Sequence, residues 1–302
     1  MKTVLLYVLL IVALLPIRSV AQGCSDAGFC TLHYRETTPN EGIYKPVNRL
    51  AFESGYNIGE NNTGIVTISV EYGWQINRNL RWNNKITAAN IHGEFGNHFN
   101  VGDLYSTISF PIDKHHSEKF LLLAGLKLPL TRSNDKIQGQ ALPMVYQTSL
   151  GTYDLVAGGS VLLSHWDLQF AAQIPVINQN QNSFLAAFST KPGYLNTNAF
   201  RRKPDVLLRI GYPLHKGSWI LNPNLLGIYH LGRDSYADQT GQRVAINGSD
   251  GFTLNANLQA NYQITQKQSL QLSLATPLIV RENRPDGLTR SFVASVAYSF
   301  GW

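Results

Sequence analysis

The last residues of the chain alternate between large apolar and mostly small side chains. Neighbouring side chains of a β-strand point to opposite faces, and in a membrane barrel aromatic rings gather at the membrane interface. We therefore predict that the chain ends in a strand of an all-β, transmembrane, antiparallel up-and-down β-barrel. We expect its final rings to be what the barrel-assembly machinery engages during insertion into outer-membrane lipid. The apolar face comprises Phe292, Ala294, Val296, Tyr298, Phe300 and Trp302.

The start of the chain predicts export. Lys2 precedes an apolar run over residues 4–15 that is too short to span a bilayer, and Ser19-Val20-Ala21 forms a small-x-small cleavage site. We expect residues 1–21 to be a secretory signal peptide and the mature protein to lie in the outer membrane of a Gram-negative envelope. Removing Lys2 and Arg18 lowers the formal charge from +6 to +4. Because no cluster of basic and aromatic residues occurs, no nucleic-acid partner is expected.

The rest of the sequence argues against membrane helices. No later stretch approaches 18 consecutive apolar residues, and 44% hydrophobic with 15% charged residues is an ordinary soluble composition. A β-barrel gives this balance because each strand has a polar lumen face beside its lipid face.

Two cysteines, Cys24 and Cys30, lie just after the predicted cleavage site. We predict that they form a disulfide in the oxidising periplasm. The alternative is acylation of Cys24, but Gln22 stands where a lipoprotein signal has a small residue. A metal site is less favoured still.

Period-two alternation predicts an even number of strands, twelve, in one barrel domain over residues 48–302. In the clearest strand, residues 251–264, apolar side chains alternate with threonine and amides. The expected strands cover residues 48–58, 64–75, 83–94, 100–111, 119–129, 151–163, 166–176, 205–213, 218–230, 251–264, 267–279 and 290–301.

The links between these strands alternate in length. Links after even-numbered strands are short, whereas the longest links, residues 130–150, 177–204 and 231–250, follow odd-numbered strands. Barrels have short periplasmic turns and longer external loops, so we place the three long loops outside the cell. Most prolines fall near strand ends, but Pro223 lies mid-strand. We interpret it as a β-bulge, the alternative being a sideways opening in the wall.

The same alternation points charged side chains inward, because a basic side chain facing lipid at mid-membrane costs about 2–4 kcal/mol. Either these groups pair and fill a narrow interior, or they form a polar constriction that selects a solute. Residues 22–47, or the loop at 177–204, could plug the lumen. The constriction residues are Glu71, Asp103, Lys127, Asp154, Asp167 and Arg209, with Glu53 also inward.

Three short motifs carry a resemblance. Gly102-Asp-Leu104, Gly125-Leu-Lys-Leu-Pro129 and Gly151-Thr-Tyr-Asp154 resemble recurring elements of the outer-membrane family associated with the meta-cleavage pathway of phenol degradation. The resemblance covers residues 100–175 and implies a transporter-like barrel. The cysteine segment departs from the family pattern, which leaves a shared substrate open.

Enzyme motifs are lacking: no Gly-x-Ser-x-Gly, metal-spaced His/Glu group or phosphate loop occurs. Some barrels are phospholipases with an outward Ser-His pair, but we interpret His115, His116, His165 and His230 as exposed and solvated. We therefore expect a passive channel, without cofactor or metal, for a small and hydrophobic or aromatic solute. The alternatives are a non-conducting structural or partner-binding barrel and, less favoured, a lipid hydrolase.

Overall fold

The computed structural model describes residues 47–302 apart from 78, 113–118, 192 and 287–291. The predicted signal peptide, both cysteines, residues 22–46 and His115-His116 lie outside this part of the chain. Within it, no helix is long and apolar enough to cross a membrane.

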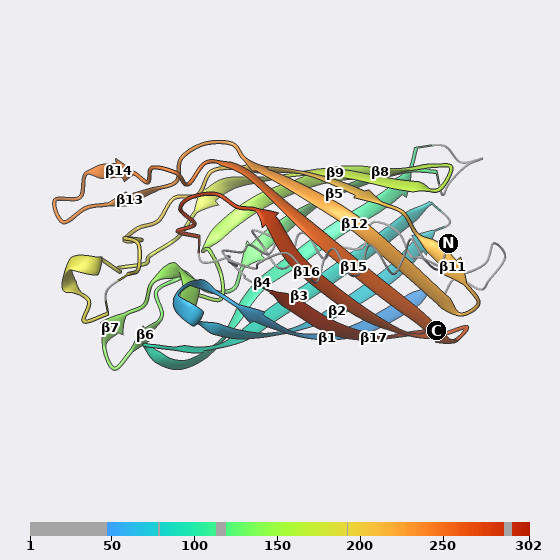
Figure 1. The fold of residues 1–302 in the computed structure, drawn as a ribbon, viewed down its shortest axis with the longest axis horizontal. Coiled ribbons are helices and arrows are strands. Elements are labelled where there is room, and N and C mark those ends of the chain that lie inside the picture. Colours follow the sequence, from blue (N-terminus) through green and yellow to red (C-terminus); the bar gives the residue numbers. More distant parts are fainter. Residues whose placement is uncertain (1–46, 78, 113–118, 192, 287–291) are drawn as a thin grey trace, which may run out of the picture.

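The described residues form a closed antiparallel β-barrel whose strands follow one another around the wall (Figure 1). The fold and strand number expected from the alternation are confirmed. The wall strands are β1 (Asn48–Ile58), β2 (Gly64–Asn77), β3 (Leu80–Gly93), β4 (Gly96–Pro111), β5 (Phe120–Pro129), β8 (Thr152–Leu163), β9 (Trp166–Asn178), β10 (Asp205–Gly211) continued by β11 (Leu214–Lys216), β12 (Trp219–His230), β15 (Gly251–Thr265), β16 (Gln268–Ile279) and β17 (Val293–Gly301).

The barrel closes between its first and last strands. Strand β1 pairs with both β2 and β17, and the backbone of Asn48 exchanges hydrogen bonds with that of Trp302. Closure leaves no unpaired edge, which is the condition for a sheet to survive in lipid. The predicted last strand begins three residues later than expected, at Val293.

The two ends of the barrel differ, as the link lengths predicted. The C-terminus and the short turns after β8, β11 and β15 lie at one end, and the long loops lie at the other together with the tight turn between β3 and β4 (Figure 1). The loops contain local structure of their own: the hairpins β6 (Lys136–Ile137) with β7 (Gln140–Ala141) and β13 (Ser235–Ala237) with β14 (Arg243–Ala245), and the 3-10 turns η1 (Glu60–Asn62), η2 (Met144–Tyr146) and η3 (Ala186–Phe188).

The outer face is apolar and carries rings near the turn end. Leu258, Leu272 and Val296 are 42%, 43% and 47% exposed although they are aliphatic. Rings meet at the turn end. The ring centroids of Trp219 and Tyr262, on the paired strands β12 and β15, are 4.7 Å apart, and those of Tyr72 on β2 and the terminal Trp302 are 6.4 Å apart across β1. Such a band of rings is typical of a membrane interface girdle.

The bulge expected at Pro223 is absent. Pro223 lies opposite Leu258 in an unbroken register between β12 and β15. On its other side, its carbonyl accepts a hydrogen bond from the Tyr212 amide at 3.1 Å, so its missing N–H faces the break between β10 and β11 that contains Pro213. The two prolines together interrupt one ladder without shifting its register.

Candidate functional site: the barrel lumen

The inner face of the barrel is polar, and all six predicted constriction residues lie on it. Their relative exposures are 9% for Glu71 and Arg209, 5% for Asp167, 4% for Asp103 and 0% for Lys127 and Asp154. Their role in selecting a solute stays a prediction.

Lys127 forms the centre of a buried ion-pair group on three adjacent strands. Its Nζ lies 2.9 Å from Asp154 Oδ2, 3.9 Å from Asp103 Oδ2 and 3.1 Å from Thr152 Oγ1. Ser149 donates to Asp103 at 2.5 Å, and Gln173 donates to Asp154 at 2.5 Å. Burying charges is costly unless they are paired and hydrogen-bonded, and this group meets both conditions.

The three motifs that carry the family resemblance supply this ion-pair group, one charged residue each. Their glycines provide close approach: a Cβ on Gly102 would lie 2.8 Å from the Thr148 carbonyl oxygen. Gly151 has φ 66°, a conformation that favours glycine. Segments far apart in the chain therefore meet around one lysine.

Two further polar groups flank it around the wall. Arg209 donates to Gln169 at 3.3 Å, and Gln169 donates to Asp167 at 2.8 Å, which links β9 to β10. On the other side, Lys85 Nζ lies 2.9 Å from Glu53 Oε2, joining β3 to β1. Lys85 is only 3% exposed and was not among the predicted constriction residues. Its place opposite Glu71 in the β2–β3 register was a signal that could have revealed it.

An apolar stripe also runs along the inner face. It crosses β4, β5, β8, β9, β10 and β12, so the interior is not uniformly polar. Its residues are Tyr105, Leu123, Val156, Ala171, Leu207, Leu226 and Ile228.

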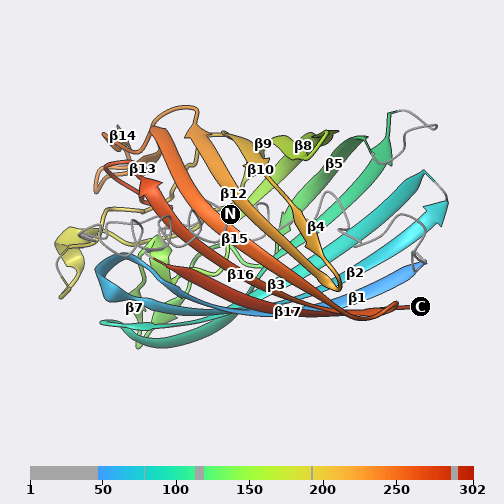
Figure 2. The same cartoon turned by 45° about the vertical axis from the view of Figure 1, so that its right-hand side comes forward.

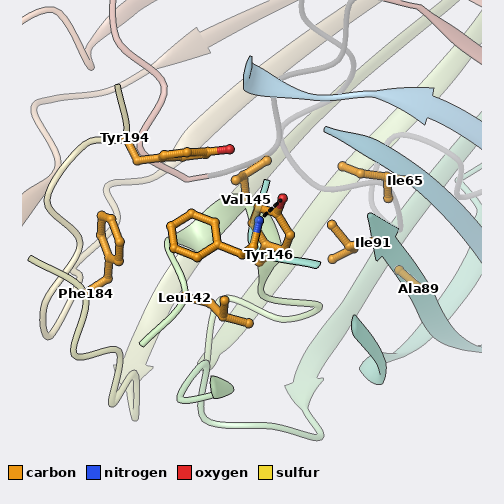
Figure 3. Packing of buried hydrophobic residues seen from close by; sticks show 9 residues of the cluster. Ile65, Ala89, Ile91, Leu142, Val145, Tyr146, Phe184 and Tyr194 are labelled. Atoms are coloured by element: carbon orange, nitrogen blue, oxygen red, sulfur yellow. Dashed lines mark hydrogen bonds between the residues drawn. The ribbon is translucent and has the colours of Figure 1, made fainter. Parts of the chain in front are cut away.

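The long loops pack into an apolar core at the barrel mouth, which we call the mouth cluster (Figure 3). Tyr146 accepts a hydrogen bond from the Phe95 amide at 3.3 Å, and the two rings lie edge to face at 5.2 Å. Burial raises the pKa of Tyr194 to about 12, against the opposing effect of the Thr63 hydroxyl. The cluster comprises Ile65, Ala89, Ile91, Phe95, Leu142, Val145, Tyr146, Phe184 and Tyr194.

Two phenylalanines of the loop at 177–204, which we considered as a plug, differ in burial. Phe184 is 1% exposed within the mouth cluster, whereas Phe188 is 72% exposed. Part of this loop thus packs onto the loop that carries Tyr146.

A second group, at the long-loop end, is charged and was missed from the sequence; we call it the rim cluster. It comprises Arg202, Asp205, His230, Asp234, Arg281 and Asp286. His230, which we interpreted as exposed, is 1% exposed. Its Nδ1 lies 2.5 Å from Asp205 Oδ1 and its Nε2 lies 2.8 Å from Asp234 Oδ1. Burial raises the pKa of Asp234, while its contacts with His230 act in the opposite direction.

The rim cluster joins three loops, those after β9, β12 and β16, to the ends of β10 and β12. Arg202 pairs with Asp205, and Arg281 lies 2.9 Å from Asp286. No periodic pattern predicted this cluster, because most of its members come from loops, whose mutual packing is not encoded in a strand pattern.

One serine contacts a histidine side chain among the described residues. Ser164 Oγ lies 3.4 Å from His165 Nδ1 in the exposed turn between β8 and β9. The residues are neighbours in the chain, and no acidic group is bonded to the ring within the described part. A catalytic triad needs a third side chain that orients the base, and none is hydrogen-bonded to this ring in the described part, so this pair does not form a triad.

Comparisons with known proteins give a fold and no family. No family model matches the sequence, and no curated protein matches it. An outer membrane channel from Pseudomonas putida F1 matches 88% of this chain over 100% of its own, with a TM-score of 0.56 and 16% identity. The NanC porin matches 84% of this chain over 98% of its own at 11% identity and a TM-score of 0.44.

Outer membrane phospholipase A from Escherichia coli also appears, covering 89% of this chain and 95% of its own at 13% identity and a TM-score of 0.43. Neither of these two weaker likenesses carries an argument about function. The likeness to the Pseudomonas channel extends over the whole length of that protein. The chain therefore has the fold of an outer-membrane β-barrel.

Proposed function

We propose that this protein is a passive outer-membrane channel for a small solute. The observation that carries the proposal is the two-sided wall: aliphatic side chains are exposed outside, while charged and amide side chains line the inside. A barrel of this size leaves room for a narrow pore, because eight strands are filled by their own side chains and sixteen leave an aqueous channel. The similarity to a solved outer membrane channel adds support.

The ion pairs around Lys127 would act as a fixed part of the constriction. Each charge is held by side-chain or backbone partners, so the cross-section at this level would change little as a solute passes. Glu71, Asp103, Asp154, Asp167 and Arg209 would share this role, and transport would be diffusion without covalent chemistry.

A hydrophobic or aromatic solute is favoured by two features. The apolar stripe along the inner wall offers contacts to an apolar body. The motifs at Asp103, Lys127 and Asp154 resemble those of the family associated with the meta-cleavage pathway of phenol degradation. Both would also agree with an amphiphilic solute.

One observation favours the alternative of a closed structural barrel. Lys127 and Asp154 are 0% exposed, so neither side chain faces an open lumen. The exposed Phe188 ring on the outer loops would suit a partner-binding role in such a barrel.

Single-channel recording tests the proposal directly. The refolded full chain is added to a planar lipid bilayer in KCl, with the same protein after boiling as control. Steady current steps from the folded protein alone would support a channel. Silence from repeated insertions, with insertion verified by protease protection, would reject it in favour of the closed barrel.

The plug predicted at residues 22–47 has its own test. The same recording with a variant lacking these residues would show larger current steps if they narrow the lumen. Equal steps in the two proteins would exclude that role.

A further inference from the structure

Charge is absent from one third of the barrel wall. Four consecutive strands, β12, β15, β16 and β17, contain no Asp, Glu, Lys or Arg, and they lie side by side in orange and red in Figure 2. Each of the other eight wall strands carries at least one charged residue. Charge in this barrel is therefore segregated around the circumference.

Apart from Leu226 and Ile228, which belong to the apolar stripe, the inner face of these four strands is mostly a ladder of amides and hydroxyls, which we call the carboxamide wall. Asn224 faces Asn257 in the β12–β15 register, and Gln259 faces both Asn222 and Ser273. The residues between them, such as Leu258, are on the lipid side. The wall comprises Asn222, Asn224, Asn255, Asn257, Gln259, Asn261, Ser269, Gln271, Ser273, Ser295 and Ser299.

Hydrogen bonds within the wall join amides to each other but do not use all of their donors and acceptors. Asn257 Nδ2 donates to Asn224 Oδ1 at 2.9 Å, and Asn222 Nδ2 donates to Gln259 Oε1 at 3.4 Å. An amide side chain has two donors and one acceptor oxygen with two lone pairs, so each retains capacity for a further partner.

Two observations indicate that these unused donors and acceptors bind groups of a solute. Asn257 and Gln259 are only half-buried, in contrast to Lys127 and Asp154 on the charged side, so their amides are reachable from the lumen. Asn255 is 1% exposed, yet within the described part of the chain neither its Nδ2 nor its Oδ1 has a hydrogen-bond partner. Buried polar groups are nearly always hydrogen-bonded, and one that is not calls for a partner that both donates and accepts.

We infer that the solute moves along the carboxamide wall and is an uncharged molecule bearing several hydroxyl or amide groups. Amides exchange hydrogen bonds with such groups without the large desolvation cost of stripping water from an ion. A charged solute meets no opposite charge on this wall, and the charges across the lumen are held in pairs. The inference rests on the proposed channel function. For the substrate class, it favours this polar, uncharged solute over the hydrophobic or aromatic one that the apolar stripe alone would suit.

Osmotic swelling of proteoliposomes that contain the refolded full chain tests the class. Glucose, gluconate and glucosamine are close in size and differ in charge. We expect glucose to enter at least fivefold faster than either charged relative. Equal rates for all three would overturn the inference while leaving the channel intact, and no entry together with no current would overturn the proposed function itself.

Substitutions at Gln259 test the route, with the exposed loop residue Gln242 as the matched control. Gln259→Leu should lower glucose entry about fivefold, the factor that corresponds to the ~1 kcal/mol of one hydrogen bond, and change KCl conductance less than twofold. Gln242→Leu should leave both unchanged. Equal glucose entry in Gln259→Leu and the parent protein would overturn the route.

A charge probe covers the case in which Gln259→Leu does not fold, as judged by mobility on unboiled gels. Gln259→Glu keeps an acceptor oxygen for Asn222, and a carboxylate on the solute's route attracts cations. We expect the reversal potential in a KCl gradient to move toward cation selectivity for Gln259→Glu and to stay unchanged for Gln242→Glu. An unchanged value for Gln259→Glu would place the pore elsewhere and overturn the inference.

Discussion

The charged side of the barrel and the carboxamide wall handle burial in opposite ways. Around Lys127, every charge lies within reach of a counter-charge or a hydroxyl, and the group is sealed from solvent. On the carboxamide wall no charge is present, and several amides, among them Asn257 and Gln259, are only half-buried. A wall built on ion pairs must be complete, because one missing partner leaves a buried charge, whereas a wall of amides tolerates incomplete pairing.

In the proposed channel, this difference would separate two tasks of one narrow lumen. The paired charges of Lys127 and Asp154, at 0% exposure, fix the shape of the interior. Because each neutralises the other, the pair attracts a charged solute only weakly. Half-exposed amides contribute less to rigidity and remain available for exchange. Because paired charges and amides lie on different parts of the circumference, one side of the barrel would be rigid and the other would offer hydrogen bonds to a solute.

Removing the cation of the charged side should produce the largest effect. Lys127→Met leaves Asp154 buried beside Asp103 without its counter-charge, and breaking a buried pair in this way costs about 3–5 kcal/mol. Urea unfolding of the refolded barrel, followed by tryptophan fluorescence, measures the loss. The exposed Lys216→Met serves as control and should unfold like the parent protein.

The double variant Lys127→Met with Asp154→Asn should recover part of that loss, because it removes the stranded charge as well. If Lys127→Met alone unfolds at the parent midpoint, the ion pairs do not hold this side of the barrel and the contrast between the walls fails.

The two faces of the carboxamide wall should respond differently to the same new charge. Leu258→Lys puts an ammonium on the lipid face, at a cost of about 2–4 kcal/mol if it lies near mid-membrane. Gln259→Lys puts it one residue away on the lumen face, where water can solvate it, so we expect a loss below ~1 kcal/mol. Unfolding in lipid vesicles gives both values, and equal losses would contradict the assigned alternation.

A deletion on the carboxamide wall should cost less than one on the charged side. Asn257→Leu removes the donor to Asn224 but strands no charge, so the expected loss in unfolding free energy is about 0.5–1.5 kcal/mol. The same urea titration used for Lys127→Met makes the comparison. A loss as large as that of Lys127→Met would show that both walls are equally rigid.

The sequence predicted the strands of the walls better than the contacts between the loops at the long-loop end. Period two placed Lys127 and Gln259 on the inner face, because along a strand orientation follows directly from position. It could not show that Asp103, Lys127 and Asp154 meet, since that depends on the stagger between strands, although the motifs around them were visible. His230 was misjudged for a related reason: its burial depends on Asp234, a loop residue outside any periodic pattern.

Strand ends were the least predictable part of the wall. Strand β10 stops at Gly211 rather than at Pro213, because Pro213 and Pro223 lie on facing strands and together remove the ladder there. Each proline alone was visible in the sequence, but their pairing was not.

The loops show the same contrast, since one of their clusters buries uncharged groups and the other buries charges. A pH titration of Tyr194 tests this contrast, and we expect its effect on stability to be the smallest of those predicted here. The mouth cluster buries Tyr194 as a neutral phenol whose pKa burial raises from 10.0 to about 12, whereas the rim cluster buries charges. Below pH 10 the phenol is protonated whether the cluster is packed or open, so its packing is unaffected. Between pH 10 and pH 12 only the open form ionises readily, and the stability of the mouth cluster should fall across that window.

Near-ultraviolet circular dichroism of the loop rings measures this loss as the pH is raised. Tyr194→Phe keeps the ring and removes the ionisable group, so its signal should persist to higher pH than that of the parent protein. If the two proteins lose signal together, Tyr194 does not control the packing of the mouth. The alkaline sensitivity would then have to arise from the rim cluster, which would reverse the contrast that distinguishes the two kinds of burial in these loops.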